Sequence, residues 1–89
     1  MKAVVTVVGK DQVGIIAMVC NKLAEFNINV LDISQTVMQG YFTMMMVVDV
    51  SAATLPLALL CQVMEDTGKE KNLSIRVQRE DIFEAMHRV

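Results

Sequence analysis

The segment GKDQVG, residues 9–14, holds the residues of this 89-residue sequence that are best suited to bind a small molecule. Asp11 lies where a helix N-cap is expected, and its carboxylate would accept the backbone N–H of Val13 or Gly14. Gly14 falls in the expected first turn, where glycine costs roughly 0.5–1 kcal/mol relative to alanine, so a ligand or another backbone has reason to approach it. The free N–H groups of that turn attract carboxylates, and Asp11 would attract an ammonium. Simple capping and the binding of a zwitterion both remain open.

Groups suited to catalysis or metal binding are sparse. The single histidine, His87, lies near the end of the sequence, where a surface position is expected. Asp11, Asp32 and Asp49 fall on different expected elements, and Cys20 has the apolar helical context of a small core residue rather than a nucleophile. Two cysteines and one histidine at these separations make no zinc signature. We therefore expect no enzyme activity, no metal and no cofactor.

Composition limits the classes of partner. The net charge is −2 and the basic residues are scattered, which argues against nucleic acid or an anionic membrane as a partner. No apolar run is long enough to span a bilayer. Hydrophobic residues make up 54% of the chain but aromatic residues only 4%, and eight methionines contribute much of the excess. We expect a cytoplasmic protein with reduced thiols, an aliphatic and thioether core, and some apolar surface left for a partner.

Hydrophobic periodicity predicts six main elements. Alternation and β-branched residues predict strands, and spacing at 3.6 residues predicts helices. The expected strands cover residues 2–8, 27–39, 41–50 and 73–78, and the expected helices lie at 13–26 and within 51–72.

Local signals refine the second helix and the tail. Ser51 and Thr54 are N-cap candidates, and Pro56 is well placed near a first helical turn. The polar run DTGKEKN is expected to end this helix, and Gly40 marks a tight reversal between the two middle strands. The tail DIFEAMHRV, residues 81–89, is expected to form one or two short helical turns.

The order β-α-β-β-α-β predicts an α+β fold, a ferredoxin-like sandwich formed by a single domain over residues 1–89. Right-handed crossovers place both helices on one face of a four-stranded antiparallel sheet of order 4-1-3-2, with a short C-terminal helix added. Alternation in the third strand divides its side chains between a helix-facing set and an open-face set. The first set is Phe42, Met44, Met46, Val48 and Val50, and the second is Tyr41, Thr43, Met45, Val47 and Asp49. Apolar residues in the second set predict that the C-terminal turns, a second subunit or both cover the open face.

The segment VTVVGKDQVGIIAMVCNKLAEFNINVLDISQ resembles the ACT domain, a small regulatory module with this same element order. The matching features are the KDQVGI loop after a strand and the LAEFNINV end of an amphipathic helix. This form is similar to the ACT modules of glycine-cleavage regulators and of formyltetrahydrofolate deformylase. The segment DISQTVMQGYFTMMMVV and the ending IFEAMHRV look like a family of stand-alone small ACT proteins, so the resemblance covers the whole chain.

The resemblance implies a homodimer that binds an amino acid or a related metabolite where the first loop meets the neighbouring subunit's second strand. The ligand-binding residues implied at matching positions are Asp11, Gln12, Val13, Gly14 and Asn29. Gly9 stands where the serine-sensing module of phosphoglycerate dehydrogenase has a ligand-contacting histidine, and Asp11 replaces an asparagine, so serine specificity does not transfer. For Asn29, a simple role in the helix–strand turn stays open beside the ligand role. The alternative function is a protein-interaction module that works through the apolar sheet face and has lost ligand binding.

Overall fold

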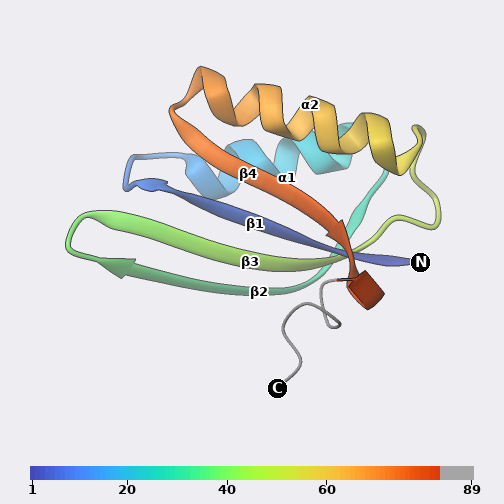
Figure 1. Ribbon diagram of the computed structural model, residues 1–89, viewed down its shortest axis with the longest axis horizontal. Helices are drawn as coiled ribbons and strands as arrows, with labels where there is room; N and C mark the ends of the chain where they lie inside the picture. Colours follow the sequence, from blue (N-terminus) through green and yellow to red (C-terminus); the bar gives the residue numbers. More distant parts are fainter. Residues whose placement is uncertain (83–89) are drawn as a thin grey trace.

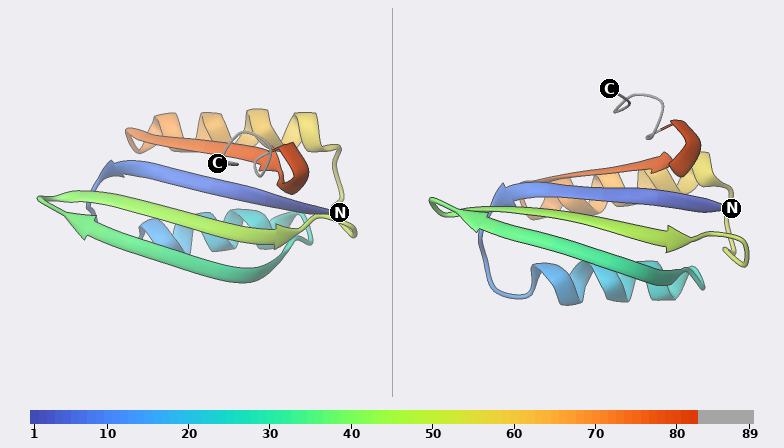
Figure 2. Two further views of the ribbon diagram at one scale, coloured as in Figure 1. Left: turned by 60° about the horizontal axis from the view of Figure 1, so that its bottom comes forward. Right: turned by 90° about the horizontal axis from the view of Figure 1, so that it is seen from below.

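The computed structural model describes residues 1–82 and shows all six predicted main elements in the predicted order (Figure 1). The strands are β1 (Lys2–Lys10), β2 (Asn29–Met38), β3 (Tyr41–Asp49) and β4 (Leu73–Arg79), and the helices are α1 (Ile15–Glu25) and α2 (Leu57–Glu70). The strands form one antiparallel sheet of order β2-β3-β1-β4, which is the predicted 4-1-3-2 read from the other edge. Both helices lie on one face of this sheet (Figure 2). The ferredoxin-like prediction is confirmed.

The core lies between the sheet and the helices, and the alternation predicted for β3 places its side chains correctly. All five helix-facing residues of that prediction are buried, whereas Tyr41, Thr43 and Met45 on the other face are exposed. The inward residues of β1 and β4 add a second and third row of aliphatic side chains. The helices supply the other wall of the core through Ile15, Val19, Leu23, Leu60 and Met64.

The turn between β2 and β3 explains why the hairpin register is well defined. Gln39 and Gly40 both have positive φ, at 51° and 81°. Two central residues of positive φ match the right-handed twist of the flanking strands, which is the reason two-residue hairpins favour them. Gly40 marks the tight reversal, as predicted.

Two expectations about helix starts are wrong. Gly14, with a φ of 87°, is the N-cap of α1, and no side chain caps this helix. Asp11 is therefore not the N-cap, and the helix begins at Ile15 instead of residue 13 because left-handed backbone cannot continue into a helix. At α2 the N-cap is Pro56, not Ser51 or Thr54, and again no side chain caps the turn. Proline needs no amide partner there, since its nitrogen carries no hydrogen.

The polar run DTGKEKN, residues 66–72, ends α2 as predicted, since the helix continues through Gly68 and ends at Glu70. Gly68 is buried where the helix lies against β4. A Cβ built at Gly68 would sit 2.6 Å from the carbonyl oxygen of Leu73 and 2.9 Å from Cγ1 of Ile75. This glycine serves close packing inside the helix rather than ending it.

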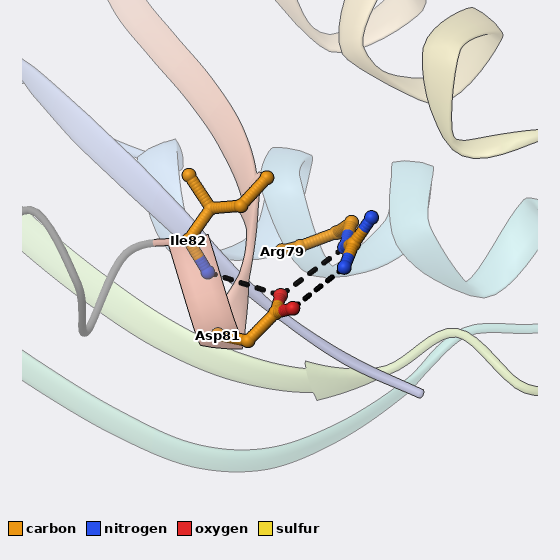
Figure 3. Close-up of polar contacts among 3 residues, drawn as sticks. All are labelled: Arg79, Asp81 and Ile82. Atoms are coloured by element: carbon orange, nitrogen blue, oxygen red, sulfur yellow. Dashed lines mark hydrogen bonds and ion pairs between the residues drawn. The ribbon is translucent and has the colours of Figure 1, made fainter.

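The end of β4 is fixed by a two-point ion pair (Figure 3). Arg79 donates from Nε to Asp81 Oδ1 at 3.1 Å and from a terminal nitrogen to Asp81 Oδ2 at 2.5 Å. Asp81 also accepts the backbone N–H of Ile82 at 3.0 Å, and the side-chain bonds from Arg79 are the main reason that the pKa of Asp81 is lowered. The turn at residues 80–82 is helical, where the tail was predicted to turn. The rest of that predicted tail, residues 83–89, lies outside the described residues.

No helix within the described residues is long and apolar enough to cross a membrane.

The packing at Gly68 generates a test of the fold. Gly68→Ala should lower the free energy of unfolding by about 1–3 kcal/mol, because the added methyl group would overlap the backbone at Leu73. In an exposed helix the same change normally raises stability by roughly 0.5–1 kcal/mol. Urea unfolding measures the difference, with Asn21→Ala on the exposed face of α1 as a control expected within about 0.5 kcal/mol of the parent. A stabilised Gly68→Ala variant would contradict the packing described.

Candidate functional site

Three connections meet at one end of the sheet (Figure 1). They are the β1–α1 loop, the β2–β3 hairpin turn and the α2–β4 turn. The backbone N–H of Asp11 donates to the carbonyl oxygen of Gly40 at 2.8 Å. Nε2 of Gln12 donates to the carbonyl oxygen of Lys71 at 3.0 Å. These two hydrogen bonds tie the first loop to both of its neighbours.

Gly9 makes the approach of β1 and β4 possible at this end. It lies within β1, one residue before that strand ends, and pairs with Leu73 of β4. A Cβ at Gly9 would fall 2.5 Å from Cδ2 of Leu73 and 3.2 Å from the carbonyl oxygen of Asn72. A Cβ at this position would therefore push aside the Leu73 side chain, which lines the site described next.

A cavity of about 210 Å³ lies beneath the first loop. Its lining comes from the β1–α1 loop, the first turn of α1 and the α2–β4 connection. The lining residues are Gln12, Val13, Gly14, Ile15, Met18, Lys71 and Leu73. Aliphatic and thioether residues together with a few polar groups are the usual components of a small-molecule site.

Gly14 has a different role from the one its helix propensity suggested. An added Cβ would meet no atom within 4 Å, so the position has space for a side chain. Its φ of 87° is what favours glycine, because L-residues are strained in that region. The left-handed residue turns the chain directly into α1 and leaves Gln12 and Val13 beside the cavity.

The five sequence-predicted site residues are only partly brought together. Gln12, Val13 and Gly14 line the cavity, whereas Asp11 is exposed next to it and contributes its backbone bond to Gly40. Asn29 starts β2, ten residues before the hairpin end. At about 3.3 Å per residue, that separation is roughly 30 Å within one copy of the chain.

Sequence reasoning missed four lining residues, Ile15, Met18, Lys71 and Leu73. One signal for them was available in the predicted strand order, because the start of β4 must lie beside the end of β1 in an antiparallel 4-1-3-2 sheet. The observed pairing of Gly9 with Leu73 follows from that order. Met18 lies one helical turn after Gly14, and its backbone N–H donates to the Gly14 carbonyl at 2.9 Å.

The end of β2 that carries Asn29 has an ionised neighbour. Asp49 of β3 pairs with Asn29 and accepts the backbone N–H of Ser51 at 2.9 Å. Hydrogen bonds from Ser51, first from its side chain, hold the pKa of the Asp49 carboxyl below its usual range. A carboxylate is therefore present beside Asn29 over the whole physiological pH range.

Cys61 of α2 lies outside the cavity and has the features of a structural thiol. Its Sγ donates to the carbonyl oxygen of Val77 at 3.2 Å, and burial raises the pKa of the thiol. A thiol with a raised pKa is a weak nucleophile at neutral pH. Within residues 1–82, no three of His, Cys, Asp and Glu are grouped so as to hold a metal ion.

Comparisons with known proteins place this geometry in a family. The ACT domain family model matches residues 2–78. The UPF0237 protein of Listeria innocua is 53% identical over 89 residues, which is all of both chains. The ACT domain protein of Streptococcus pneumoniae has a solved structure with a TM-score of 0.83 and 48% identity, and the match covers 98% of each chain.

A larger protein contains a unit of the same fold. The formyltetrahydrofolate deformylase of Pseudomonas syringae pv. tomato matches with a TM-score of 0.80 and 22% identity, over 88% of this chain and 27% of its own. That likeness concerns the fold alone. The family model and the two relatives with about half of their residues identical decide the assignment: this chain belongs to the ACT domain family.

Proposed function

We propose that this protein is a regulatory small-molecule-binding module: a cytoplasmic homodimer that binds an amino acid or a related metabolite between the first β-α loop and the second subunit. The cavity of about 210 Å³ beneath Gln12, Val13 and Gly14 carries the proposal. Drug-sized sites typically measure about 300–1,000 Å³, so this volume suits a molecule the size of one amino acid. Lys71 is the only ionisable residue in the described lining, which favours binding over acid–base catalysis.

Membership of the ACT family supports a regulatory role, because modules of this family bind small ligands and dimerise. The loop residues that match the family motif are those found at the cavity, with Asp11 beside it. The exposed Asp11 carboxylate is placed to attract a ligand ammonium from outside the cavity. A protein partner would then respond to the ligand-bound state, and neither nucleic acid nor a membrane takes part.

The edge strand β2 is the natural surface for the second subunit. It is ten residues long, contains no proline or lysine, and has Asp32 as its one charged residue. The apolar residues Val37 and Met38 are 53% and 68% exposed on it. The opposite edge, β4, is seven residues long and carries Arg76 and Arg79. Long apolar edges pair with other strands, whereas short charged edges resist pairing, so β2 is favoured over β4.

Pairing two β2 strands would also complete the site. In an antiparallel pair centred on Ser34, Asn29 of one copy lies opposite Met38 of the other, since the bulge between Val30 and Asp32 makes the two positions equally far from the centre. Met38 adjoins the hairpin turn, whose Gly40 holds the Asp11 backbone. Asn29 of the second copy would then lie beside the hairpin end of the first copy's sheet. The first copy's own Asn29 cannot reach that end, because it lies at the opposite end of β2.

A second candidate function rests on the open face of the sheet. Met45 and Val8 on the neighbouring strands β3 and β1 are 40% and 42% exposed there. An apolar group of this kind at the centre of a sheet face fits a protein-interaction module in which ligand binding has been lost.

A melting screen with the twenty amino acids tests the first function. A ligand present at about a hundred times its dissociation constant should stabilise the protein by roughly 2.7 kcal/mol, which corresponds to a rise in Tm of roughly 10–20 °C for a domain of this size. Met18→Trp, which fills the cavity, should abolish the rise.

Leu59→Trp is the matched control, because Leu59 is exposed on α2 and outside the cavity lining. It should keep the response of the parent protein. The amino-acid proposal fails if none of the twenty raises Tm, or if Met18→Trp responds as strongly as Leu59→Trp. Failure of the first kind favours the interaction module.

The dimer is tested by a pair of serine substitutions. Ser34 and Ser74 are both exposed on the open face, one on the β2 edge and one on the β4 edge. Ser34→Lys would place two like charges opposite each other at the centre of the proposed interface, so its mass in solution should fall from twice 9.9 kDa to 9.9 kDa. Ser74→Lys should stay dimeric. Sedimentation analysis decides, and a monomeric Ser74→Lys beside a dimeric Ser34→Lys would assign the interface to β4.

A further inference from the structure

We propose that the cavity selects an α-amino acid with an aliphatic side chain, whose carboxylate pairs with Lys71 and whose ammonium donates to Oε1 of Gln12. This inference rests on the proposed function, because it specifies the ligand of the same cavity. It assigns roles to Lys71, Met18 and Leu73, which lie outside the loop motif.

The walls of the cavity favour an aliphatic side chain. Ile15, Met18 and Leu73 supply its apolar surface, from the first turn of α1 and the start of β4. Ile15 and Leu73 are buried and Met18 is half-buried, so their positions are set by the core behind them. A polar ligand side chain placed against these groups would lose its hydrogen bonds to water without replacement. A flexible thioether such as Met18 adapts to aliphatic groups of differing shape.

The Gln12 amide is oriented by the protein itself. Its Nε2 donates a hydrogen bond to the Lys71 carbonyl oxygen at 3.0 Å, so the amide nitrogen faces the α2–β4 turn. The other end of the amide, Oε1, is an acceptor, and it has no partner among the described residues. Because an ammonium is a donor only, a correctly oriented amide oxygen beside the cavity is suited to receive it.

Lys71 supplies the matching cation. Lys22 forms an ion pair with Glu25 at 3.3 Å, and Lys69 forms one with Glu65 at 3.5 Å. Lys71 lines the cavity and makes no ion pair within residues 1–82. Its flexible four-carbon stem lets the ammonium reach a carboxylate held in the cavity.

The hydrogen bond from Gln12 keeps its side chain beside the Lys71 backbone. This bond joins the residue that accepts the ligand ammonium to the residue that binds the ligand carboxylate. In an α-amino acid both charges are attached to one carbon, so a donor and an acceptor on adjoining residues match it. The aliphatic and thioether residues of the same lining are then available to the ligand side chain.

Four ligands and full-length protein test the specificity by titration calorimetry. Leucine should bind at least tenfold more tightly than asparagine, whose side chain has the same branching but polar ends. A tenfold difference in affinity lies within the range that apolar pockets achieve. Leucinamide lacks the carboxylate and 4-methylpentanoate lacks the ammonium, so each should bind at least tenfold more weakly than leucine. Tighter binding of asparagine than of leucine would overturn the inference.

Three variants assign the carboxylate contact. Lys71→Met keeps the length of the side chain and removes its charge, so leucine affinity should fall at least tenfold while leucinamide affinity stays unchanged. Lys71→Arg should restore most of the leucine affinity, and Lys69→Met, which alters the neighbouring lysine already paired with Glu65, should have no effect on it.

The outcomes distinguish a failure of the inferred ligand specificity or Lys71 contact from a failure of the proposed function itself. If leucine binds but Lys71→Met lowers the affinities of leucine and leucinamide equally, or leaves both unchanged, the role of Lys71 is overturned and the proposed function stands. If a polar amino acid is the preferred ligand, the aliphatic specificity is overturned in the same way. If no amino acid binds the parent protein, the proposed function fails and this inference fails with it.

Discussion

The backbone hydrogen bond from Asp11 to Gly40 is the contact on which the site depends. It joins the first loop to the β2–β3 hairpin, and the bond from Gln12 to the Lys71 carbonyl joins the same loop to the start of β4. Two residues after the second of these attachments, the left-handed backbone at Gly14 starts α1 without any capping side chain. The loop is thereby held over a cavity whose far wall, at Leu73, is brought in by the close approach of Gly9.

The two edge strands of the sheet differ in length and in charge. The β4 edge is short, carries two arginines, and ends in the ion pair between Arg79 and Asp81. The β2 edge is long and nearly uncharged, with its apolar side chains exposed. A second copy on β2 would bury that apolar surface and bring Asn29 to the loop, so the same contact would supply stability to a small domain and complete its binding site. Ligand binding and dimerisation would then stabilise each other.

Much of this arrangement could be predicted from the sequence. Alternation in residues 41–50 placed five side chains in the core correctly, and the β-α-β-β-α-β order gave the strand order. The roles of the glycines could not be predicted in the same way, because propensity does not distinguish a glycine needed for positive φ, such as Gly14 at the start of α1, from one needed for close packing, such as Gly68 within α2. Lys71 and Leu73 were missed because they are distant from the loop in sequence and come beside it through tertiary contacts, the pairing of Gly9 with Leu73 and the hydrogen bond from Gln12 to Lys71.

The central claim is that the site is shared between two copies of the chain. Isotope-filtered nuclear Overhauser spectroscopy on a dimer of one labelled and one unlabelled chain measures this most directly, because it detects contacts between copies alone. We predict contacts from the Asn29 side-chain amide of one copy to residues 38–40 of the other, together with contacts along β2. Intermolecular contacts confined to β4 or to the open face, with none from Asn29, would contradict the account.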